Sequence, residues 1–503
     1  MADIKKLRPF INGQFVESKT DKYTDAYNPS TGEVIAKVPC CTIEEVEAAV
    51  AAAKAAYPAW SATPVLKRVQ VLYKLRELLV QHMDELTHLV ALENGKNWSE
   101  AQGDVLKAKE GTEQAIAAPS LMMGECLMDA SSGFDTMLYR EPLGVFAGIV
   151  PFNFPAMIPF GWMAPICIAT GNTMVIKAAT FTPQSALRIA ELYKEAGLPD
   201  GVINIVTCSR NESELLLSHP DIEGISFVGS TSVGRHIYKT AAAAGKRVQA
   251  LCEAKNHALV LNDAPIERTA AGIINSAFGC AGERCMALPV IVVQERIADA
   301  LIAEVVKQAK ALKIGPAYEK DTQLGPLVNA GHKKFVTDWI DKGVEEGADL
   351  ILDGRGAVVP GYEGGFYVGP TIFDNVTSDM AIGANEIFGP VLCFKRVKTF
   401  QEGLELMNGS PFANGSVIFT QNGHYAREFT RHTHGGMVGV NVGIPVPVGM
   451  FPFAGHKDSF IGDLHCLGKD GYRFYTESKV ITTRWFTEEE GKSTVVSTWD
   501  GTI

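Results

Sequence analysis

The chain has 503 residues, of which 46% are hydrophobic and 20% are charged. This length exceeds what one hydrophobic core organises, so we expect two or three domains of ordinary globular composition. The formal net charge of −11 argues against a protein that holds nucleic acid or an anionic membrane through its overall field, although a local basic patch stays compatible with it. The ten cysteines lack the spacing of a zinc site or a disulfide framework, so no bound metal is expected.

Two segments bear on where the protein resides. Lys5 and Lys6 lead into Asn12-Gly13 between apolar residues, which is typical of a hairpin turn and not of a signal peptide. The uncharged run 142–176 is long enough to cross a membrane, but four prolines would interrupt such a helix. We therefore expect a cytoplasmic protein in which this run forms a buried strand, a loop and a core helix.

The first part of the chain has the periodicity of helices. Thr42-Ile43-Glu44-Glu45 forms a capping box that opens an alanine-rich helix towards Tyr57. Amphipathic patterns predict two further helices at about 67–92 and 100–117. Residues 126–140 then predict two strands joined around Ser131-Ser132-Gly133.

From residue 145 onward, strands and helices alternate. Apolar runs predict strands at 145–149, 173–177, 202–206 and 224–228. The segments between them predict helices at 165–171, 184–196 and 211–218. This order favours a parallel, doubly wound α/β sheet. The pattern restarts after residue 255 with a strand at 258–261 and a helix at 266–279, which predicts a second α/β domain.

One cysteine lies in a segment suited to nucleophilic chemistry. The stretch 278–286 is rich in small residues and places Arg284 directly before Cys285. Small residues allow a small electrophile to approach the sulfur, and a neighbouring positive charge favours the reactive thiolate. From this segment alone, however, a buried apolar cysteine is the simpler interpretation.

Two other segments predict a nucleotide-binding turn and a fixed amide. The stretch 227–234 is a strand, a glycine turn and a helix start, whose backbone N–H groups suit a diphosphate. Its GxxxxG spacing is a weak signal, which a plain strand–turn–helix also explains. Asn153 lies in the proline-bracketed stretch 151–155, where its amide could stabilise an oxyanion or simply serve a turn.

The stretch 386–390 places a carboxylate two residues before an aromatic ring. Glu386 is suited to accept hydrogen bonds from both hydroxyls of a ribose, and Phe388 to enclose a nicotinamide. A surface glutamate beside a core phenylalanine is the alternative interpretation.

Taken together, the stretches 151–155, 227–230, 282–285 and 386–390 resemble the aldehyde dehydrogenase superfamily in order along almost the whole chain. The resemblance implies an α/β fold with a Rossmann-like cofactor domain, an α/β catalytic domain and a β oligomerisation arm that forms dimers or tetramers. The implied ranges are 1–123 and 142–255 for the cofactor domain, 256–467 for the catalytic domain, 124–141 and 468–486 for the arm, and 487–503 for a C-terminal tail.

The same resemblance implies roles for single residues. Cys285 attacks an aldehyde, and its backbone N–H and the Asn153 amide hold the oxyanion. Lys177 and Glu386 bind the two riboses of NAD or NADP. The remaining cofactor-binding positions implied are Pro151, Phe152, Thr180, Gly229, Ser230, Gly234 and Phe388.

Within the superfamily, the stretches 118–124, 254–257, 444–447 and 474–476 resemble the methylmalonate-semialdehyde dehydrogenase branch. That branch oxidises semialdehydes of short dicarboxylates, such as methylmalonate and malonate semialdehyde, and passes the acyl group to coenzyme A. It binds the substrate carboxylate with two arginines; one position matches Arg284, and the other falls on Lys107, which keeps the charge without the bidentate fork.

The sequence departs from the superfamily where the fate of the acyl group is decided. Hydrolytic members carry a glutamate base in a Glu-Leu-Gly-Gly-Lys stretch, and here the base position is Leu251, which favours transfer to coenzyme A. Glu253 replaces a glycine of that stretch, and strand alternation would direct it to the same face as Leu251. It either substitutes for the base, giving a hydrolytic enzyme that releases a free acid from another aldehyde, or contacts Lys255.

Two further points concern cofactor choice and activity. The usual Lys-Pro-Ser-Glu stretch is Lys177-Ala178-Ala179-Thr180 here, and without a carboxylate at Thr180 we expect NADP to be tolerated. A non-catalytic relative kept as a structural protein is the third hypothesis. Retention of Cys285, Asn153 and Glu386 argues against it.

Overall fold

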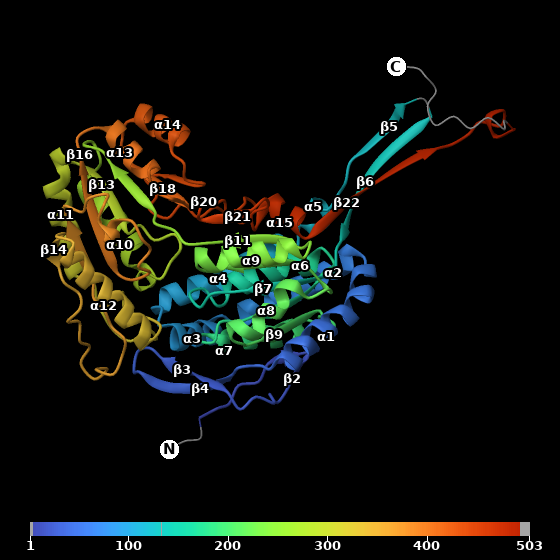
Figure 1. Cartoon of the computed structure of the whole chain (residues 1–503), viewed down its shortest axis with the longest axis horizontal. Coiled ribbons are helices and arrows are strands. Elements are labelled where there is room, and N and C mark those ends of the chain that lie inside the picture. The colour runs from blue at the N-terminus through green and yellow to red at the C-terminus, as the bar shows by residue number, and fades with distance from the viewer. Residues whose placement is uncertain (1–3, 132, 493–503) are drawn as a thin grey trace.

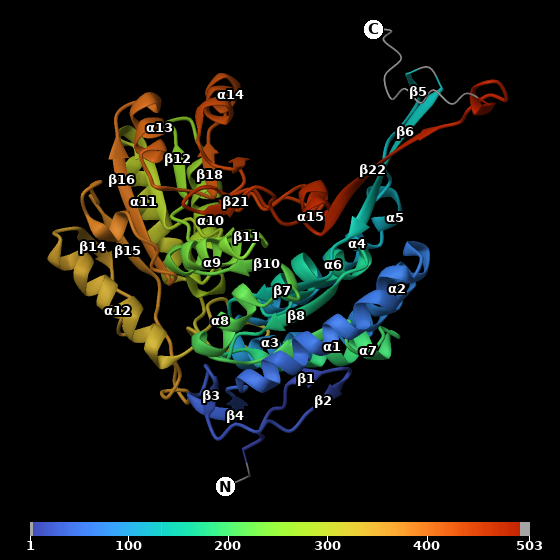
Figure 2. The same cartoon turned by 45° about the vertical axis from the view of Figure 1, so that its right-hand side comes forward.

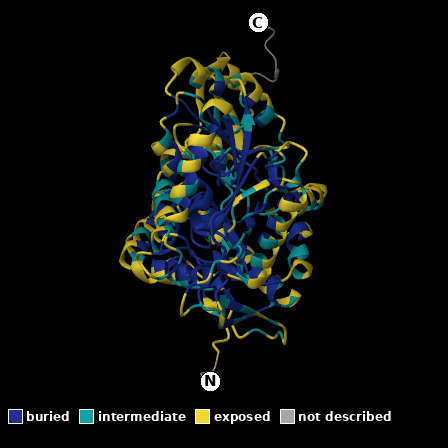
Figure 3. Ribbon diagram, turned by 90° about the vertical axis from the view of Figure 1, so that its left-hand side faces the viewer, coloured by how far each residue is buried: buried dark blue, intermediate teal, exposed yellow. Residues whose placement is uncertain are grey.

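Two largely parallel sheets organise the chain. The structure is a computed structural model that describes residues 4–131 and 133–492. Each sheet forms the centre of its own α/β body, and a thin three-stranded sheet projects away from both (Figures 1 and 2). The strands at the centre of each body are buried, whereas the exposed residues lie mainly on the outer faces of the helices (Figure 3).

The first sheet has eight strands in the order β2-β1-β9-β8-β7-β10-β11-β21. The five strands from β9 to β11 in this order run parallel, which confirms the doubly wound arrangement. The strands expected at 145–149 and 173–177 have those bounds. The strands are β1 (Phe10–Ile11), β2 (Gln14–Phe15), β7 (Val145–Ile149), β8 (Thr173–Lys177), β9 (Ile203–Val206), β10 (Ile222–Val228), β11 (Arg247–Leu251) and β21 (Phe460–Gly462).

Helices cover this sheet. The Thr42 capping box opens the first of them, as predicted. The helix expected at 67–92 is two helices, because His82 leaves helical geometry and an acidic turn starts the second one. The helices are α1 (Ile43–Ala62), α2 (Val65–Gln81), α3 (Met83–Asn94), α4 (Trp98–Ala115), α7 (Pro183–Glu195), α8 (Arg210–Ser218) and α9 (Thr231–Ala243).

The uncharged run 142–176 lies in this body. Its helical part begins earlier than the expected residue 165, with a π-helical segment at Ile158–Met163 that continues into α6 (Ala164–Ala169). Every residue of both segments is buried against protein. Among the described residues, no helix combines the length and the apolar character needed to cross a membrane.

The second sheet has seven strands in the order β14-β15-β16-β13-β12-β18-β19, of which only the edge strand β14 runs antiparallel to its neighbour. Its strands are β12 (His257–Val260), β13 (Val290–Gln294), β14 (Asp349–Leu352), β15 (Thr371–Asp374), β16 (Val391–Val397), β18 (Gly415–Phe419) and β19 (Met437–Val440). Its helices are α10 (Ile266–Phe278), α11 (Glu295–Lys310), α12 (Ala330–Glu345), α13 (Phe400–Asn408) and α14 (Gly423–His432).

The projecting sheet joins segments far apart in sequence. It consists of β5 (Cys126–Ser131), β6 (Phe134–Pro142) and β22 (Thr476–Arg484), with β6 in the middle. Ser132, in the expected turn, lies outside the described residues, as do residues 493–503 of the expected tail. The domain ranges themselves stay a prediction. The remaining elements are β3 (Tyr23–Asn28), β4 (Glu33–Pro39), α5 (Ala118–Leu121), β17 (Phe412–Ala413), β20 (His456–Lys457), α15 (Gly468–Phe474) and short 3₁₀ turns at Gly279–Gly282, Ala381–Gly383 and Glu490–Lys492.

Candidate active site

Four of the predicted motifs begin at one edge of the first sheet. Ile149 is paired with Lys177 across β7 and β8, and with Phe227 across β7 and β10. Val228 is in turn paired with Leu251 across β10 and β11. Ligands of doubly wound sheets bind in the loops that follow the carboxyl ends of such strands. The fold therefore brings these motifs together although they are far apart in sequence.

The glycine turn after β10 positions the N-terminus of α9 at this edge. Gly229 donates its backbone N–H to the Leu251 carbonyl over 3.0 Å, and Ser230 is the N-cap of the helix. A Cβ on Gly234 would lie 2.5 Å from the Cys252 sulfur, so only glycine lets α9 pack this closely against the end of β11. The helix N-terminus is thus presented as an anion site requires.

Aromatic rings form a wall beside the same edge. The ring centroid of Phe152, which follows Pro151, lies 5.9 Å from that of Phe388 at an interplanar angle of 87°. The rings of His332 and Phe181 lie 6.0 and 6.2 Å from Phe152. Rings from separate segments thus provide an apolar surface suited to a planar heteroaromatic group.

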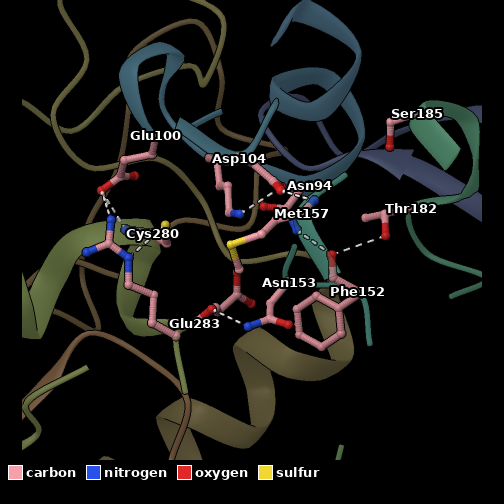
Figure 4. A network of polar contacts seen from close by, with 12 residues as sticks. Asn94, Glu100, Asp104, Phe152, Asn153, Met157, Thr182, Ser185, Cys280 and Glu283 are labelled. Carbon is pink, nitrogen blue, oxygen red and sulfur yellow. Dashed lines mark hydrogen bonds and ion pairs between the residues drawn. The ribbon is translucent and has the colours of Figure 1, made fainter. Parts of the chain in front are cut away.

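Side chains from two helices hold the loop at 151–155 in place. The Phe152 carbonyl accepts hydrogen bonds from Asn94 Nδ2 at 3.0 Å and from Thr182 Oγ1 at 3.1 Å (Figure 4). Asn94 ends α3, and Thr182 is the N-cap of α7. The loop is therefore fixed before any ligand binds.

Lys177 and Thr180 lie at the start of the loop after β8. Burial lowers the pKa of the Lys177 ammonium, and the neighbouring Cys208 and Cys40 thiols act in the opposite direction. Thr180 is half-buried. A cation therefore stands at the strand end where the sequence predicts ribose binding, without a carboxylate at position 180.

Glu386 is a partly buried carboxylate near the Cys285 thiol. It accepts the Ala254 backbone N–H at 3.2 Å. Burial raises the pKa of Glu386 to about 8, and the negative charge of Glu386 in turn raises the pKa of Cys285. The structure thus places Glu386 and Phe388 on the same side of the site as the thiol.

The loop that carries the thiol has an unusual backbone. After α10 ends, Cys280 and Ala281 both have φ of 51°, and Gly282 has φ of 76°. A Cβ on Gly282 would lie 2.0 Å from the Gly389 carbonyl oxygen, so glycine is required where the two loops touch. This close approach joins the loop that carries Cys285 to the segment that carries Glu386.

Amide side chains fix the backbone around Cys285. Its carbonyl accepts from Asn256 Nδ2 at 2.8 Å and from Asn414 Nδ2 at 3.2 Å. The buried Asn153 donates through Nδ2 to the Glu283 carbonyl at 3.0 Å, as Figure 4 shows. The side-chain amide of Asn153 has two N–H donors. One donates to the Glu283 carbonyl, and the other can donate to a further acceptor.

The positive charge of Arg284 lowers the pKa of Cys285, as the sequence predicts, but burial of the thiol acts in the opposite direction and is the larger effect. Burial raises the pKa of Cys285 to about 12 and the Glu386 charge adds to it, which outweighs the favourable effects of Arg284 and Lys96. The Arg284 guanidinium is directed elsewhere: Nε lies 3.1 Å from the Cys280 sulfur, and Nη2 lies 3.4 Å from Glu100. The thiol is therefore protonated at neutral pH.

A cavity of about 360 Å³ opens beside Cys285. Arg284 and Lys107, the two predicted substrate-binding residues, both line it. Its apolar lining consists of Phe154, Met157, Trp162, Met286, Ile444, Val446 and Phe453. The fold thus gathers a thiol and two cations around one small, mostly apolar space, which suits a short aldehyde with an anionic end.

Sequence reasoning missed two carboxylates that line this cavity, Glu100 and Asp104 on α4. Glu100 pairs with Arg284 and also accepts the Cys280 backbone N–H at 2.7 Å. Asp104 forms a fully buried ion pair with Lys96 at 3.1 Å. The spacing of Glu100, Asp104 and Lys107 on one helix face was the available signal. Lys107 itself pairs with Glu110 at 2.6 Å and is half exposed.

The structure also shows where Leu251, at the predicted base position, and Glu253 lie. Leu251 is buried in the core at the end of β11. Because the strand ends there, alternation does not extend to Glu253, whose carboxylate accepts the Thr231 N–H at 2.9 Å. Lys255 instead donates to the Ile382 carbonyl at 2.8 Å. The expected contact between Glu253 and Lys255 is therefore replaced by one between Glu253 and Thr231, and a role of Glu253 as a base stays a prediction.

Comparisons with known proteins agree along the whole chain. The aldehyde dehydrogenase family model matches residues 15–481. Malonate-semialdehyde dehydrogenase 1 of Geobacillus thermodenitrificans is 50% identical over 483 residues, covering 96% of this chain and 99% of that protein. The crystal structure of methylmalonate-semialdehyde dehydrogenase from Oceanimonas doudoroffii superposes with a TM-score of 0.94 at 41% identity, covering 96% and 99% of the two chains. An NAD⁺ complex of aldehyde dehydrogenase from Bacillus cereus superposes with a TM-score of 0.90 at 32% identity, covering 95% and 97%.

Proposed function

The chain belongs to the aldehyde dehydrogenase family and has its fold, as the sequence motifs predict, and from that premise we propose that it oxidises a short semialdehyde and transfers the acyl group to coenzyme A. Malonate semialdehyde and methylmalonate semialdehyde are the proposed substrates. The observation that carries the proposal is the cavity lined by Cys285, Arg284 and Lys107, together with the buried leucine, Leu251, at the predicted base position.

The residues at the sheet edge fit a nicotinamide dinucleotide. The turn at Gly229 and Ser230 presents a helix N-terminus to a diphosphate, and Gly234 allows the close packing behind it. Lys177 and Glu386 are the proposed ribose-binding residues, and the Phe152 and Phe388 rings suit a flat ring. When bound, NAD or NADP accepts the hydride. The absence of a carboxylate at Thr180 supports use of NADP as well as NAD.

In the proposed reaction, the Cys285 sulfur adds to the aldehyde carbon, the carbonyl π bond breaks to leave an oxyanion, and the thiol proton passes to solvent water. The developing oxyanion is stabilised by the Cys285 backbone N–H and by the second N–H of Asn153. Loss of hydride from that carbon removes two electrons and restores the carbonyl as a thioester on the sulfur. Because the thiol is protonated in the resting protein, its proton transfer accompanies the addition.

The acyl group then passes to a thiol instead of to water. Deprotonation of water would need a base near the thioester, and Leu251 offers none. The Glu253 carboxylate is held at the start of α9 by Thr231. Coenzyme A supplies a thiol that is a better nucleophile than water at neutral pH, so attack on the thioester releases Cys285 and acyl-coenzyme A.

The anionic end of the substrate is assigned to the cations of the cavity. Each cation already has a carboxylate partner, Glu100 for Arg284 at 3.4 Å and Glu110 for Lys107 at 2.6 Å, so this proposal assigns carboxylate recognition to the two cations together. A lysine holds a carboxylate without the geometric selectivity of a bidentate arginine. We therefore expect a broader range of short semialdehydes to be accepted.

The test is a substrate panel with NAD or NADP, in the presence and absence of coenzyme A, with reduced nicotinamide measured by absorbance and products by mass spectrometry. We expect turnover with both semialdehydes to require coenzyme A and to yield an acyl-coenzyme A. Turnover that ignores coenzyme A and releases a free acid would instead establish the hydrolytic alternative.

The projecting sheet is proposed as an oligomerisation arm of a homodimer or homotetramer. Its strand β5 is exposed along its whole length and forms one edge of the sheet. Leu127, Met128 and Val480 expose 61%, 78% and 61% of their surface on this sheet, and association through its edge would bury such apolar side chains. Light scattering of the intact chain tests this assignment, which a monomer would overturn.

A further inference from the structure

A carboxylate occupies the position at which the dinucleotide diphosphate is expected. Glu253 Oε2 accepts the backbone N–H of Thr231, the first residue of α9, at 2.9 Å. Thr231 Oγ1 accepts the Glu253 backbone N–H at 3.3 Å in return. The reciprocal pair fixes the carboxylate at the positive end of the helix.

The start of α9 has no capping hydrogen bond from its own N-cap side chain. Its N-cap residue, Ser230, accepts no hydrogen bond from a backbone N–H of the first turn, and its hydroxyl lies 3.4 Å from that of Ser232 instead. Glu253 therefore takes the place that a capping side chain fills in other helices. A diphosphate bound at the same turn would use the same donor, because anions at helix N-termini are held by the first backbone N–H groups.

The charges around Glu253 also disfavour binding of a diphosphate at the start of α9. Glu253 and Glu386 lie close enough for the charge of Glu253 to raise the pKa of Glu386. The nearest cation on α9, Arg235, forms an ion pair with Asp458 at 2.5 Å. A diphosphate carries two negative charges. The carboxylates near the start of α9 therefore disfavour its binding unless Glu253 moves away. Glu253 is only half-buried, which leaves its side chain room to turn outward.

We propose that Glu253 sets the affinity of the cofactor site, because its carboxylate competes with the dinucleotide diphosphate for the Thr231 N–H and so weakens cofactor binding. The inference rests on the proposed function only in requiring a dinucleotide at this edge of the sheet. Cofactor binding and displacement of the Glu253 carboxylate are then one event.

Binding is measured by titration calorimetry on the full chain with three probes: NAD, ADP-ribose, which keeps the diphosphate, and adenosine, which lacks it. Glu253→Ala frees the Thr231 N–H, and Glu253→Gln keeps an acceptor but removes the charge. We expect Glu253→Ala to bind NAD and ADP-ribose about tenfold more tightly, with a smaller gain for Glu253→Gln. Affinity for adenosine should not change.

Glu402→Gln is the matched control, because the Glu402 carboxylate accepts a backbone N–H of Lys398 at 2.8 Å beside the start of α13, away from the site. It should leave all three affinities unchanged. The melting temperature without ligand should fall in both Glu253 variants, since each weakens the helix cap.

A lower melting temperature with an unchanged ratio of ADP-ribose to adenosine affinity would show that Glu253 is only a cap, and would overturn the inference. If no variant binds NAD or ADP-ribose, the dinucleotide assignment of the proposed function fails, and the inference with it. If all variants bind ADP-ribose equally well, the inference alone fails.

Discussion

The side-chain amide of Asn153 donates to the carbonyl of Glu283 at 3.0 Å, and so rests against the loop that carries Cys285. The two residues come from loops of the two different α/β bodies: Asn153 follows β7, and Glu283 follows α10. The contact sets the position of the amide relative to the sulfur before substrate arrives, which is what stabilisation of an oxyanion demands.

Replacement of Asn153 by alanine should therefore lower kcat by about 10²–10³-fold, the usual effect of removing one oxyanion donor. Steady-state assays with the preferred semialdehyde measure this, and circular dichroism checks the fold. Asn211→Ala, an exposed position on α8, is the control and should retain full activity. An Asn153→Ala enzyme of normal kcat would remove the amide from the mechanism.

The pKa of Cys285 should govern its reaction with iodoacetamide. With the pKa raised to about 12 by burial, little thiolate exists at pH 7, and its amount grows by about tenfold per pH unit below the pKa. Peptide mass spectrometry should show labelling at Cys285 that rises without a plateau between pH 7 and 10. Cys126, exposed on the arm, should react faster at pH 7. A plateau near pH 7 would mean a thiolate in the resting protein.

Replacement of Lys107 should change KM for anionic substrates only. We expect Lys107→Met to raise KM for malonate semialdehyde by about tenfold, because a charge-assisted hydrogen bond to the substrate is lost. KM for propanal, which has no carboxylate, should stay the same. Lys109→Met on the same helix, where Lys109 pairs with Glu113 at 3.0 Å, serves as control. Equal changes for both aldehydes would indicate a structural effect instead.

The buried pair between Lys96 and Asp104 should be important for stability. Lys96→Met leaves the Asp104 carboxylate buried without its cation, and should cost about 3–5 kcal/mol of unfolding free energy. Denaturant unfolding provides the measurement. Lys307→Met breaks an exposed pair with Glu304 and should cost less than about 1 kcal/mol. Similar losses in the two variants would contradict the role given to burial.

Restoring a base should change the product. Leu251→Glu places a carboxylate at the position where hydrolytic relatives carry one, so we expect free acid to form without coenzyme A. The matched variant Leu251→Gln introduces a polar group of similar size without a base, and should not hydrolyse the thioester. If the Glu and Gln variants behave alike, position 251 does not decide the fate of the acyl group.

The sequence predicts those features whose causes are local. The strands ending at Ile149 and Lys177 follow from uninterrupted apolar runs, and the helix at Thr42 from a capping box within four residues. The family motifs are likewise short and contiguous, so they identify the family whatever the packing of distant segments.

The surroundings of the reactive groups depend on the tertiary structure. The sequence favours activation of Cys285 by Arg284, but Glu100, on a helix far earlier in the chain, directs the guanidinium away from the thiol. Strand alternation predicts a shared face for Leu251 and Glu253, but β11 ends at Leu251 and the loop carries the carboxylate to Thr231. Periodicity describes one element at a time, so contacts between loops of different elements lie beyond it.

The sequence by itself determined the family and the alternation of strands and helices between residues 145 and 228, because each of these depends on residues that are neighbours along the chain, and it also predicts Cys285 as the nucleophile. Only the tertiary structure decided the protonation of Cys285, the partner of Arg284 and the position of Glu253. Each of these depends on burial and on charges from segments that folding alone brings together.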